Sequence, residues 1–533
     1  MALLERSPDL PVASILEHHA KEDPDAEFLL YRDQALTYGQ VDDEARALAA
    51  ALSNMGVEPG DRVAIILPGC PEFIVSLFAL ARLGVVLVPM NPRLPEAELR
   101  YMLRHSEAVC AITVENLHGV DYLQLFEDLL PRLPELQYLV TVGEEDLWYD
   151  DRIYQFEDLV SAGTGRSIDA EVTEDPDGLF AIVYTSGTTG KPKGVELTRR
   201  NLLYVAAGTV RGLGLMPSDR IIGITALFHV FGLAPGILGT ALAGATLVLH
   251  EPGDPEEALR LIETHGVTIH YGVPMLFAAE LREQRRSPRD LSSLRLGLVA
   301  GAPLREDLFN EVEEELCPLL LTAYSLTETS STLCLGRPDD SAEKRRYTVG
   351  RPLPGTELRV VEPDGTPLPV ESLGELAVRS PGVMRGYYRQ PRETASCFDD
   401  AGFFRTGDLG IVDEDGHVHL VGRRQDVIIR GGSNVHPREV EDRLHAHPAL
   451  LEAVVVGLRD DLLGEAICAA VVPMEGAIVT ADEIRDWCRH TLADHKVPDV
   501  VRFVDALPST GTGKIRRVEI ARLMEAEQDS PDS

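Results

Sequence analysis

Residues 184–194 read Tyr184-Thr185-Ser186-Gly187-Thr188-Thr189-Gly190-Lys191-Pro192-Lys193-Gly194. They follow the apolar run Leu179-Phe180-Ala181-Ile182-Val183, which predicts a buried strand that leads into a loop. Glycines let backbone N–H groups approach a ligand closely, and the hydroxyl and ammonium groups supply further donors. The sequence therefore predicts a binding site for polyphosphate at this loop.

The loop differs from the standard nucleotide P-loop, which has a glycine five residues before its Gly-Lys pair and a Ser or Thr after it. Thr185 and Pro192 occupy those positions here. The two lysines are informative because the chain has only 6 lysines against 44 arginines. Since a lysine ammonium acts as a compact point charge for phosphate, they favour a phosphate site over an ordinary surface turn.

Strand and helix patterns alternate along the first part of the chain. Apolar runs at residues 63–67 and 85–88 flank a helical pattern at 71–83, and residues 42–55 also have helical spacing. The same alternation returns at residues 245–249, 256–265, 267–270 and 295–300. This pattern predicts an α/β fold, with a large domain of mainly parallel sheets and helices.

The pattern changes near residue 356. Short alternating strands at residues 357–361, 374–378 and 417–421 predict a small antiparallel or β-barrel-like subdomain over about 356–424. After Gln425 a compact α+β pattern follows, with helices at 437–445 and 481–492 and strands at 453–456 and 466–472. We therefore expect an N-terminal domain over 1–424 and a small C-terminal domain over 425–533, with an acidic, disordered tail from about residue 525.

The bulk properties exclude several classes of function. A formal net charge of -36 argues against nucleic acid and anionic membranes as partners. Seven cysteines without a CxxC pair fit a reducing compartment better than a disulfide framework or a cysteine zinc site. The longest apolar stretches are interrupted, the one at 236–249 is too short to span a bilayer, and the first residues lack a signal-peptide core. We expect a cytoplasmic protein with no transmembrane segment.

Further motifs follow the loop in an order that resembles one family, the adenylate-forming enzymes: acyl-CoA synthetases, amino-acid adenylation domains and beetle luciferases. The resemblance covers almost the whole chain. Besides the loop it rests on Leu36-Thr37-Tyr38, Gly60-Asp61-Arg62-Val63, Phe228-His229-Val230-Phe231-Gly232, Tyr324-Ser325-Leu326-Thr327-Glu328, Thr406-Gly407-Asp408, Gly422-Arg423-Arg424-Gln425-Asp426 and Pro508-Ser509-Thr510-Gly511-Thr512-Gly513-Lys514.

The resemblance implies a reaction in two halves that uses ATP, Mg²⁺ and coenzyme A. A carboxylate attacks the α-phosphorus of ATP, giving an acyl-adenylate and pyrophosphate; a thiol then attacks the acyl carbon and releases AMP. Because a carboxylate is already an anionic nucleophile, such a protein mainly positions anions and neutralises charge as it shifts.

The resemblance also assigns the nucleotide site. Tyr324 is expected to stack on adenine, Asp408 to accept both ribose hydroxyls, and Arg423 to help hold ribose or phosphate. The full set of expected ATP- and AMP-binding residues is Thr185, Ser186, Gly187, Thr188, Thr189, Gly190, Lys191, Gly301, Ala302, Pro303, Thr322, Ala323, Tyr324, Ser325, Thr327, Asp408, Arg423 and Lys514.

Catalytic roles are implied in the same way. Glu328 is expected to ligate Mg²⁺, and Lys514 to bridge the substrate carboxylate and the α-phosphate. Thr185 and His229 complete the candidate catalytic set, with His229 gating the acyl pocket or lining the route of the thiol. The C-terminal domain is expected to rotate about a hinge at Gln425, and the expected residues for coenzyme A are Arg430, Gly431 and Gly432.

Three positions depart from the family pattern. Gln425 stands where the family usually has Asp or Lys, so the charge at the hinge differs. Ser325 stands where glycine is usual, beside the acyl carboxylate, and its side chain is expected to narrow the pocket or to hydrogen-bond the substrate. Thr322, where many relatives have Gln, is a smaller change.

The expected acyl pocket is apolar. Amino-acid adenylation domains place an aspartate in the Phe228 motif, but residues 228–239 contain neither an acid nor an arginine. A buried substrate ammonium or second carboxylate would lack a partner there, so a medium- or long-chain fatty acid or an aryl acid is expected. The candidate lining residues are His229, Val230, Phe231, Leu233, Tyr271, Val273, Leu298, Val299, Gly301, Ser325 and Leu326.

Several alternatives remain open at this point. The acceptor is coenzyme A or the phosphopantetheine arm of a carrier protein, and the acid is aliphatic or aromatic. A non-catalytic ATP-binding protein on the same fold is disfavoured because Glu328, Lys514 and the full loop are retained, and luciferase-type oxidation is a remote option. A homodimer is also left open.

Overall fold

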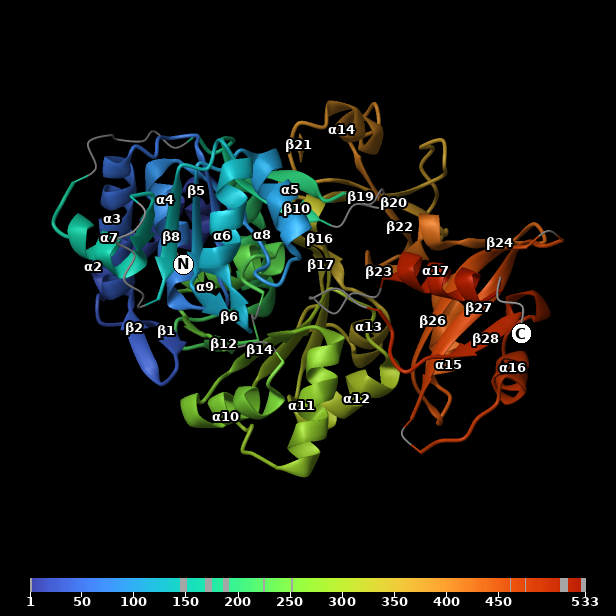
Figure 1. The fold of residues 1–533 in the computed structure, drawn as a ribbon. Coiled ribbons are helices and arrows are strands. Elements are labelled where there is room, and N and C mark those ends of the chain that lie inside the picture. The colour runs from blue at the N-terminus through green and yellow to red at the C-terminus, as the bar shows by residue number, and fades with distance from the viewer. Residues whose placement is uncertain are drawn as a thin grey trace.

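The computed structural model describes residues 2–143, 151–167, 175–185, 191–223, 226–250, 253–460, 462–474, 476–508 and 516–528. A large domain holds the N-terminal part of the chain, and a smaller domain, drawn in orange and red, lies beside it (Figure 1). Both mix helices and strands, so the predicted α/β class with a small α+β C-terminal domain is confirmed.

Two sheets form the large domain, and both are mainly parallel as predicted. The nine-stranded sheet has the order β18 (Arg351–Pro352), β17 (Ser331–Leu335), β16 (Leu320–Leu326), β15 (Leu296–Val299), β14 (Ile269–Gly272), β12 (Arg220–Ile222), β13 (Thr246–Val248), β1 (Glu27–Tyr31) and β2 (Gln34–Thr37). The eight-stranded sheet has the order β21 (Gly386–Tyr387), β11 (Lys193–Thr198), β10 (Leu179–Thr185), β4 (Val86–Pro89), β3 (Arg62–Ile66), β5 (Cys110–Val114), β8 (Tyr138–Val142) and β9 (Ile153–Gln155).

Helices connect these strands. They are α1 (Ala2–Arg6), α2 (Val12–Glu22), α3 (Tyr38–Met55), α4 (Pro71–Leu83), α5 (Glu96–Ser106), α6 (Tyr122–Leu129), α7 (Phe156–Gly163), α8 (Arg199–Leu213), the π-helix η3 (Gly232–Leu238), α9 (Gly239–Ala243), α10 (Pro255–His265), α11 (Pro274–Arg286), α12 (Glu306–Glu315), α13 (Ala342–Tyr347) and α14 (Pro391–Cys397). Helix α4 has the predicted bounds because Pro71 occupies its first turn and Gly84, at φ 64°, ends it. A small ribbon, β6 (Asn116–Leu117) and β7 (Val120–Asp121), precedes α6.

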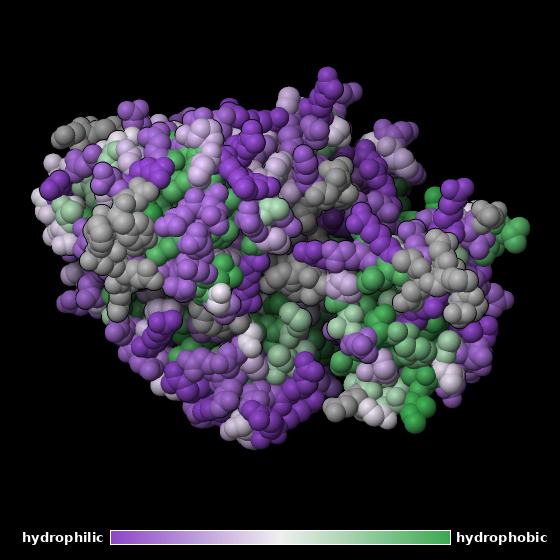
Figure 2. Space-filling view, viewed as in Figure 1, coloured by the Kyte–Doolittle hydropathy of each residue, from purple (hydrophilic) through white to green (hydrophobic). Residues whose placement is uncertain are grey.

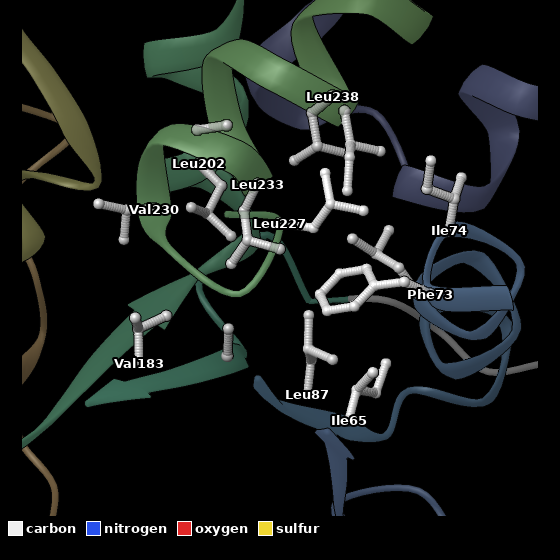
Figure 3. Close-up of a cluster of buried hydrophobic side chains, with 14 of the residues drawn as sticks. Ile65, Phe73, Ile74, Leu87, Val183, Leu202, Leu227, Val230, Leu233 and Leu238 are labelled. Atoms are coloured by element: carbon white, nitrogen blue, oxygen red, sulfur yellow. The ribbon is translucent and has the colours of Figure 1, made fainter. Parts of the chain in front are cut away.

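A hydrophobic core fills the space between the eight-stranded sheet and the helices beside it (Figure 3). Ile65, Leu87 and Val183 come from three strands of that sheet, and Phe73 and Leu233 come from α4 and η3. All five are buried. This packing holds β10 rigidly, so the glycine-rich loop leaves the sheet from a fixed strand.

The β-rich subdomain is an open sheet and not a barrel. It has four antiparallel strands in the order β19 (Glu357–Val361), β20 (Gly374–Arg379), β22 (Phe404–Val412) and β23 (Val418–Arg423). Strand β19 pairs only with β20, and β23 pairs within this sheet only with β22, so the two edges do not meet. The barrel-like expectation is therefore wrong on closure, because alternating strands reveal pairing partners but not whether the last strand returns to the first.

The C-terminal domain is an antiparallel sheet covered by helices, with one parallel strand pair. Its strands are β25 (Ser433–Val435), β24 (Ile428–Arg430), β27 (Gly464–Pro473), β26 (Leu450–Asp460) and β28 (Val500–Phe503), and its helices are α15 (Pro437–His445), α16 (Ala481–Arg489) and α17 (Arg517–Gln528). Helix α17 spans Arg517–Gln528 and overlaps the start of the tail expected from about residue 525.

The described part of the chain contains no helix with both the length and the apolar character needed to cross a membrane. All seven cysteines are free, and all but Cys397 are buried.

Candidate active site

Strand β10, which precedes the glycine-rich loop, is hydrogen-bonded to helix α5. The Tyr184 hydroxyl lies 2.8 Å from Nδ1 of His105 and donates a hydrogen bond to the carbonyl of Met102 at 3.2 Å. Burial raises the pKa of Tyr184, so the phenol stays protonated at neutral pH. This anchoring fixes the start of the loop.

The two described ends of the loop are open to a ligand. Thr185 is half-buried at the last position of β10, and Lys191 is exposed with its Nζ 5.7 Å from the centroid of the Tyr101 ring. A ring face is a weak site for an ammonium, so Lys191 can move to a phosphate at little cost. Five predicted phosphate-binding residues lie outside the described residues: Ser186, Gly187, Thr188, Thr189 and Gly190.

The expected ribose site contains a network of side chains that joins Tyr324, Asp408 and Arg423. The Tyr324 hydroxyl donates to Oδ2 of Asp408 at 2.5 Å, and Nε of Arg423 lies 3.1 Å from Oδ1. Asp408 and Arg423 face each other in the register of β22 and β23. Each carboxylate oxygen therefore has a donor from the protein, and an ionised carboxylate still has lone pairs for two ribose hydroxyls.

Burial makes this network rigid and keeps the Tyr324 phenol protonated. Tyr324 is 6% exposed and Asp408 is 7% exposed. Burial and the negative charge of Asp408 raise the pKa of Tyr324 well above its ordinary value. The phenol therefore stays protonated and continues to donate to Asp408 across the physiological pH range.

The segment expected to line the other face of adenine lies at the carboxyl end of β15. Gly301, Ala302 and Pro303 are all exposed there, next to the strand that carries Tyr324. Gly301 has φ +87°, and a Cβ at that position would lie 3.5 Å from the Val273 side chain. Ligands of open α/β sheets bind at this edge, so the position suits a nucleotide base.

The other predicted residues on and just after β16 are mostly committed to the protein. The Thr322 hydroxyl donates to the carbonyl of Thr348 at 2.8 Å, so it is already used. Ala323 is buried in the core, Thr327 is buried, and Ser325 and Leu326 are half-buried. Ser325 lies opposite Thr332 on β17 and remains the side chain of this group best placed to affect a substrate.

Glu328, the predicted metal ligand, follows β16 in a 3-10 turn (Thr327–Thr329). Its Oε1 accepts a hydrogen bond from the Tyr387 hydroxyl at 2.8 Å, and its carbonyl accepts one from the Met384 N–H at 2.8 Å. Within the described ranges the structure gives Oε2 no hydrogen-bond partner. A half-buried carboxylate with one oxygen to spare, close to a phosphate loop, fits Mg²⁺, which prefers oxygen ligands from one or two carboxylates and a phosphate.

The aromatic motif at residues 228–232 lies between the two sheets. Phe231 packs against Tyr271 with ring centroids 5.5 Å apart, and the Phe231 N–H donates to Nδ1 of His229 at 3.3 Å. His229 and Phe231 are half-buried, whereas Val230 has no exposed surface and packs in the core (Figure 3). The first two are thus accessible to a substrate, and Val230 behaves here as a core residue.

One expected pocket residue faces the wrong way. Leu298 packs in the same core cluster as Tyr271, between the sheets, but Val299 packs in the cluster beneath α10, α11 and α12. Successive residues of a strand point to opposite faces. Val299 therefore cannot line a pocket that Leu298 lines.

The turn that carries the expected coenzyme A residues lies away from the nucleotide site (Figure 1). Gln425 is exposed in a 3-10 turn (Arg424–Asp426) between the last strand of the large domain and β24. Gly431 and Gly432 form the turn between β24 and β25, which projects from the side of the small domain that faces away from β16 and β22 (Figure 1). Arg430 donates to both oxygens of Asp499, at 2.9 and 2.5 Å. In this arrangement the turn does not reach the nucleotide site.

Lys514 lies outside the described residues, but both ends of its segment are fixed. The Arg516 N–H donates to the carbonyl of Pro508 at 2.9 Å, which closes the segment at its base. The next residue, Arg517, donates to both oxygens of Glu441 at 2.5 and 2.9 Å. The described residues on either side of Lys514 are therefore joined to each other, and Arg517 is joined to α15.

The small domain has the more apolar surface. Among the described residues, eight of the fourteen exposed large hydrophobic side chains lie beyond Gln425: Ile429, Leu451, Leu462, Met474, Ile478, Phe503, Val518 and Leu523. Figure 2 shows green surface gathered on this lobe, whereas purple dominates the large domain.

Asp413, Asp415 and His417 lie in the turn between β22 and β23, with ligand atoms within 4.8 Å of one another. The spacing would suit a metal ion, but Nζ of Lys344 lies 2.5 Å from Asp413 and 3.3 Å from Asp415. An ammonium already neutralises the two carboxylates, so this cluster supports the turn of the hairpin that carries Asp408 and Arg423.

Sequence reasoning missed one residue next to the site, Tyr387, and the position of Lys193 beside it. Tyr387 contacts Glu328, and Lys193 lies with its Nζ 4.8 Å from the centroid of the Tyr387 ring. Lys193 belongs to the quoted loop, but nothing in the local sequence around Tyr387 points to Glu328. The two come together only because β21 pairs with β11.

Comparison with protein families gives two matches that follow one another along the chain. Residues 16–388 match the AMP-binding enzyme family, and residues 439–514 match the AMP-binding enzyme C-terminal domain.

Several characterised proteins are similar over most of their length. A feruloyl-CoA synthase of Amycolatopsis sp is 35% identical, with 94% of this chain and 97% of that protein covered. The mitochondrial medium-chain acyl-CoA ligase of Danio rerio is 31% identical, with 94% and 86% covered. The salicyl-AMP ligase / salicyl-S-ArCP synthetase of Mycobacterium tuberculosis is 35% identical, with 92% and 85% covered.

Solved structures agree with these matches. ATP-bound MatB from Rhodopseudomonas palustris superposes with a TM-score of 0.86 at 28% identity, covering 96% of this chain and 99% of that chain. The o-succinylbenzoate coenzyme A synthetase MenE from Bacillus subtilis, in complex with ATP and magnesium ion, has a TM-score of 0.82 at 30% identity, covering 95% and 98%.

Proposed function

Because this chain belongs to the AMP-binding enzyme family, we propose that it is an AMP-forming carboxylate–CoA ligase that acts on an apolar acid. The observation that carries the proposal is the buried network of Tyr324, Asp408 and Arg423, which presents a fixed carboxylate at the carboxyl edge of the sheet. A carboxylate acceptor suits the two hydroxyls of a ribose.

In the first half-reaction an oxygen of the acid attacks the α-phosphorus of ATP. The new O–P bond forms as the bond between the α-phosphorus and the oxygen of the β-phosphate breaks. The products of this step are acyl-adenylate and pyrophosphate. Asp408 would hold the ribose, and Lys191 and the loop would hold the outer phosphates. Lys514 would approach the substrate carboxylate and the α-phosphate, where its positive charge stabilises the charge that develops.

Glu328 would hold Mg²⁺ at the phosphates. When bound, the ion neutralises charge on the phosphate oxygens and orients the leaving pyrophosphate. Two observations support this role: the spare oxygen of Glu328, and the lack of an ion pair between Glu328 and any lysine or arginine among the described residues.

In the second half-reaction the thiol attacks the acyl carbon and AMP leaves with the bonding electrons of the C–O bond. Gly431 and Gly432 would admit the thiol arm, since the space that a Cβ would fill at either glycine has no other atom within 4 Å. Their position away from β16 (Figure 1) supports a rotation of the small domain about Gln425 between the two halves.

The proposed acid is an aryl acid or a medium- or long-chain fatty acid. Residues 228–239 contain no charged side chain that could pair with a second ionic group of the substrate. The neighbouring rings of Phe231 and Tyr271 supply an apolar wall. Relatives named for ferulate and for medium-chain acids are in keeping with both classes.

A carrier protein is the second candidate acceptor. The 35% identity to a salicyl-AMP ligase / salicyl-S-ArCP synthetase supports it, because that name includes transfer to a carrier. We propose the cytoplasm as the compartment, which the seven free cysteines support.

The test is an assay of AMP and pyrophosphate with ATP, Mg²⁺ and a panel of fatty and aryl acids, with and without coenzyme A. We expect acid-dependent AMP with coenzyme A and no ADP. ADP, or no acid-dependent turnover across the panel, would overturn the proposal. AMP-dependent loading of a phosphopantetheinylated carrier without turnover on coenzyme A would favour the second acceptor.

A further inference from the structure

The environment of Glu328 contains a contact that the ligase reaction does not by itself require. The Tyr387 hydroxyl donates to Oε1 of Glu328 at 2.8 Å. Tyr387 comes from β21, whereas Glu328 follows β16 in the other sheet of the large domain. The hydrogen bond therefore joins the two sheets at the carboxylate that is expected to bind the metal.

The backbone around Tyr387 is fixed on both sides. Tyr387 pairs with Val195 on β11, and its N–H donates to the Thr394 hydroxyl at 2.8 Å. The following N–H, of Tyr388, donates to the carbonyl of Gly194 at 2.7 Å. The phenol therefore reaches Glu328 from a rigid strand and cannot drift with a loop.

The same short segment also holds the backbone of Glu328. The Met384 N–H donates to the Glu328 carbonyl at 2.8 Å, three residues before Tyr387. One segment thus fixes both the main chain and one carboxylate oxygen of this residue. The second oxygen, Oε2, has no hydrogen-bond partner in the part of the chain that the structure describes.

Lys193 connects this arrangement to the phosphate loop. Its Nζ lies 4.8 Å from the centroid of the Tyr387 ring, and it faces Thr185 in the register of β10 and β11. The Tyr387 ring therefore contacts the Lys193 ammonium through its face and the Glu328 carboxylate through its hydroxyl group.

We propose that Tyr387 is a positioning residue that orients Glu328 for Mg²⁺, an inference that rests on the proposed ligase function. It occupies one carboxylate oxygen and leaves the other for the ion. Outer partners that hydrogen-bond a metal ligand typically change metal affinity by about 10–100-fold when removed. Tyr387 fits that role because it bonds the carboxylate and not the nucleotide network at Asp408.

The experiment measures metal binding directly. Mn²⁺ is titrated into the enzyme saturated with α,β-methylene ATP and followed by electron paramagnetic resonance, with the analogue alone as a blank. We expect Tyr387→Phe to weaken Mn²⁺ binding about tenfold, and the Mg²⁺ concentration for half-maximal AMP formation to rise by the same factor. The kcat at saturating Mg²⁺ should stay near that of the wild type.

Tyr388→Phe is the matched control, because it removes the neighbouring phenol, whose ring packs edge-on against His105 and not against Glu328. It should leave Mn²⁺ binding unchanged. In a Glu328→Gln background, Tyr387→Phe should add no further loss. Unchanged Mn²⁺ affinity in Tyr387→Phe, or an equal further loss in the Glu328→Gln background, overturns the proposal.

The result separates this inference from the proposed function. A weakened Mn²⁺ affinity in Tyr387→Phe supports the positioning role even if no acid in the panel gives AMP. Acid-dependent AMP formation with Mn²⁺ affinity unaltered by the substitution leaves the ligase function standing and removes the role of Tyr387.

Discussion

Two carboxylates of the candidate site, Asp408 on the ribose side and Glu328 on the metal side, are held in different ways. Each accepts a hydrogen bond from a tyrosine, Tyr324 at 2.5 Å and Tyr387 at 2.8 Å. Asp408 also has Arg423 at 3.1 Å on its second oxygen, and it is buried. Glu328 is more exposed, and no ion pair to it occurs among the described residues.

The difference matches the chemistry that each side would perform. A ribose is neutral, so Asp408 can be neutralised by Arg423 and still accept hydroxyl hydrogen bonds. Mg²⁺ prefers carboxylate oxygens, and Glu328 can offer Oε2 because Tyr387 bonds Oε1. The two carboxylates therefore differ in the partner they have besides tyrosine. Asp408, expected to accept hydroxyls, also has an arginine, whereas Glu328, expected to bind a cation, has no cationic partner within the described ranges.

The largest expected effect, on the rate of adenylation, comes from Lys514, which belongs to neither the ribose side nor the metal side. Lys514→Ala should slow adenylation by about 10²–10³-fold, the usual cost of removing one preorganised charge donor. Neither the ribose side nor the metal side should change, so affinities for ATP and Mn²⁺ should stay near those of the wild type. Single-turnover assays of each half-reaction provide the measurement.

Transfer of a pre-made acyl-adenylate to coenzyme A should survive in Lys514→Ala. Gly432→Leu should have the reverse effect, because a side chain would block the thiol. Equal damage to both halves by Lys514→Ala would make that lysine a structural residue and would contradict the two-arrangement mechanism.

Removing charge from each carboxylate tests the comparison directly. Glu328→Gln should lower kcat/KM for ATP by about 10²-fold and raise the Mg²⁺ requirement, because it removes the charge offered to the ion. Asp408→Asn should weaken nucleotide binding without changing the Mg²⁺ requirement. Mg²⁺ activation curves at several ATP concentrations distinguish the two variants. Identical curves for both would show that Asp408 and Glu328 do not have separate roles towards ribose and metal.

The phenol on the ribose side should matter through nucleotide affinity. Tyr324→Phe removes the hydrogen bond to Asp408, and bonds to charged groups contribute about 1.5–3 kcal/mol, so KM for ATP should rise about tenfold or more. The loss should shrink with 2′-deoxy-ATP, which makes one fewer contact to Asp408. An equal loss for both nucleotides would show that Tyr324 acts only on the base.

Ser325 lies between the two sides on β16 and should affect neither. Ser325→Gly removes the side chain next to the expected acyl carboxylate, so bulky acids should gain about tenfold in kcat/KM relative to small ones, equivalent to about 1.4 kcal/mol of relieved crowding. ATP and Mg²⁺ dependence should be unchanged. A preference profile identical to that of the wild type would show that the side chain points away from the acid.

The smallest effect is expected at the far end of the hairpin that carries Asp408 and Arg423. Burial raises the pKa of Asp413, but the hydrogen bond from Lys344 and the N–H of His417 outweigh it and hold the pKa at about 2. Because this folded value lies below the unfolded one of 3.8, the contribution to stability is present above about pH 4 and is lost as the pH falls towards 2.

Asp413→Asn should therefore lower the melting temperature by only about 1–2 °C at pH 7. Scans between pH 7 and pH 3 should show the difference between variant and wild type shrinking as the pH falls. A difference that grows towards low pH would mean that Asp413 is not held ionised by Lys344.

Local sequence signals were sufficient to predict the bounds of single helices. The bounds of α4 and α15 follow from a proline in the first turn of each helix and from apolar spacing along them. The order of the motifs was sufficient for the family and the reaction class, because each motif carries its own chemistry in a few adjacent residues. These features depend on neighbours along the chain, which a sequence displays directly.

Contacts between distant segments could not be derived in that way. The pairing of β21 with β11 brings Tyr387 to Glu328, 59 residues apart in the chain. The face of β15 on which Val299 points, the open edge of the four-stranded sheet and the remote position of the Gly431 turn likewise depend on packing.

The chain by itself therefore determined which residue types carry the chemistry, since glycines, lysines and carboxylates stand in recognisable runs. The tertiary structure alone decided how each carboxylate is held. The partner of a side chain is set by which strands pair and which faces meet, and those choices minimise the free energy of the whole molecule and not of any one segment.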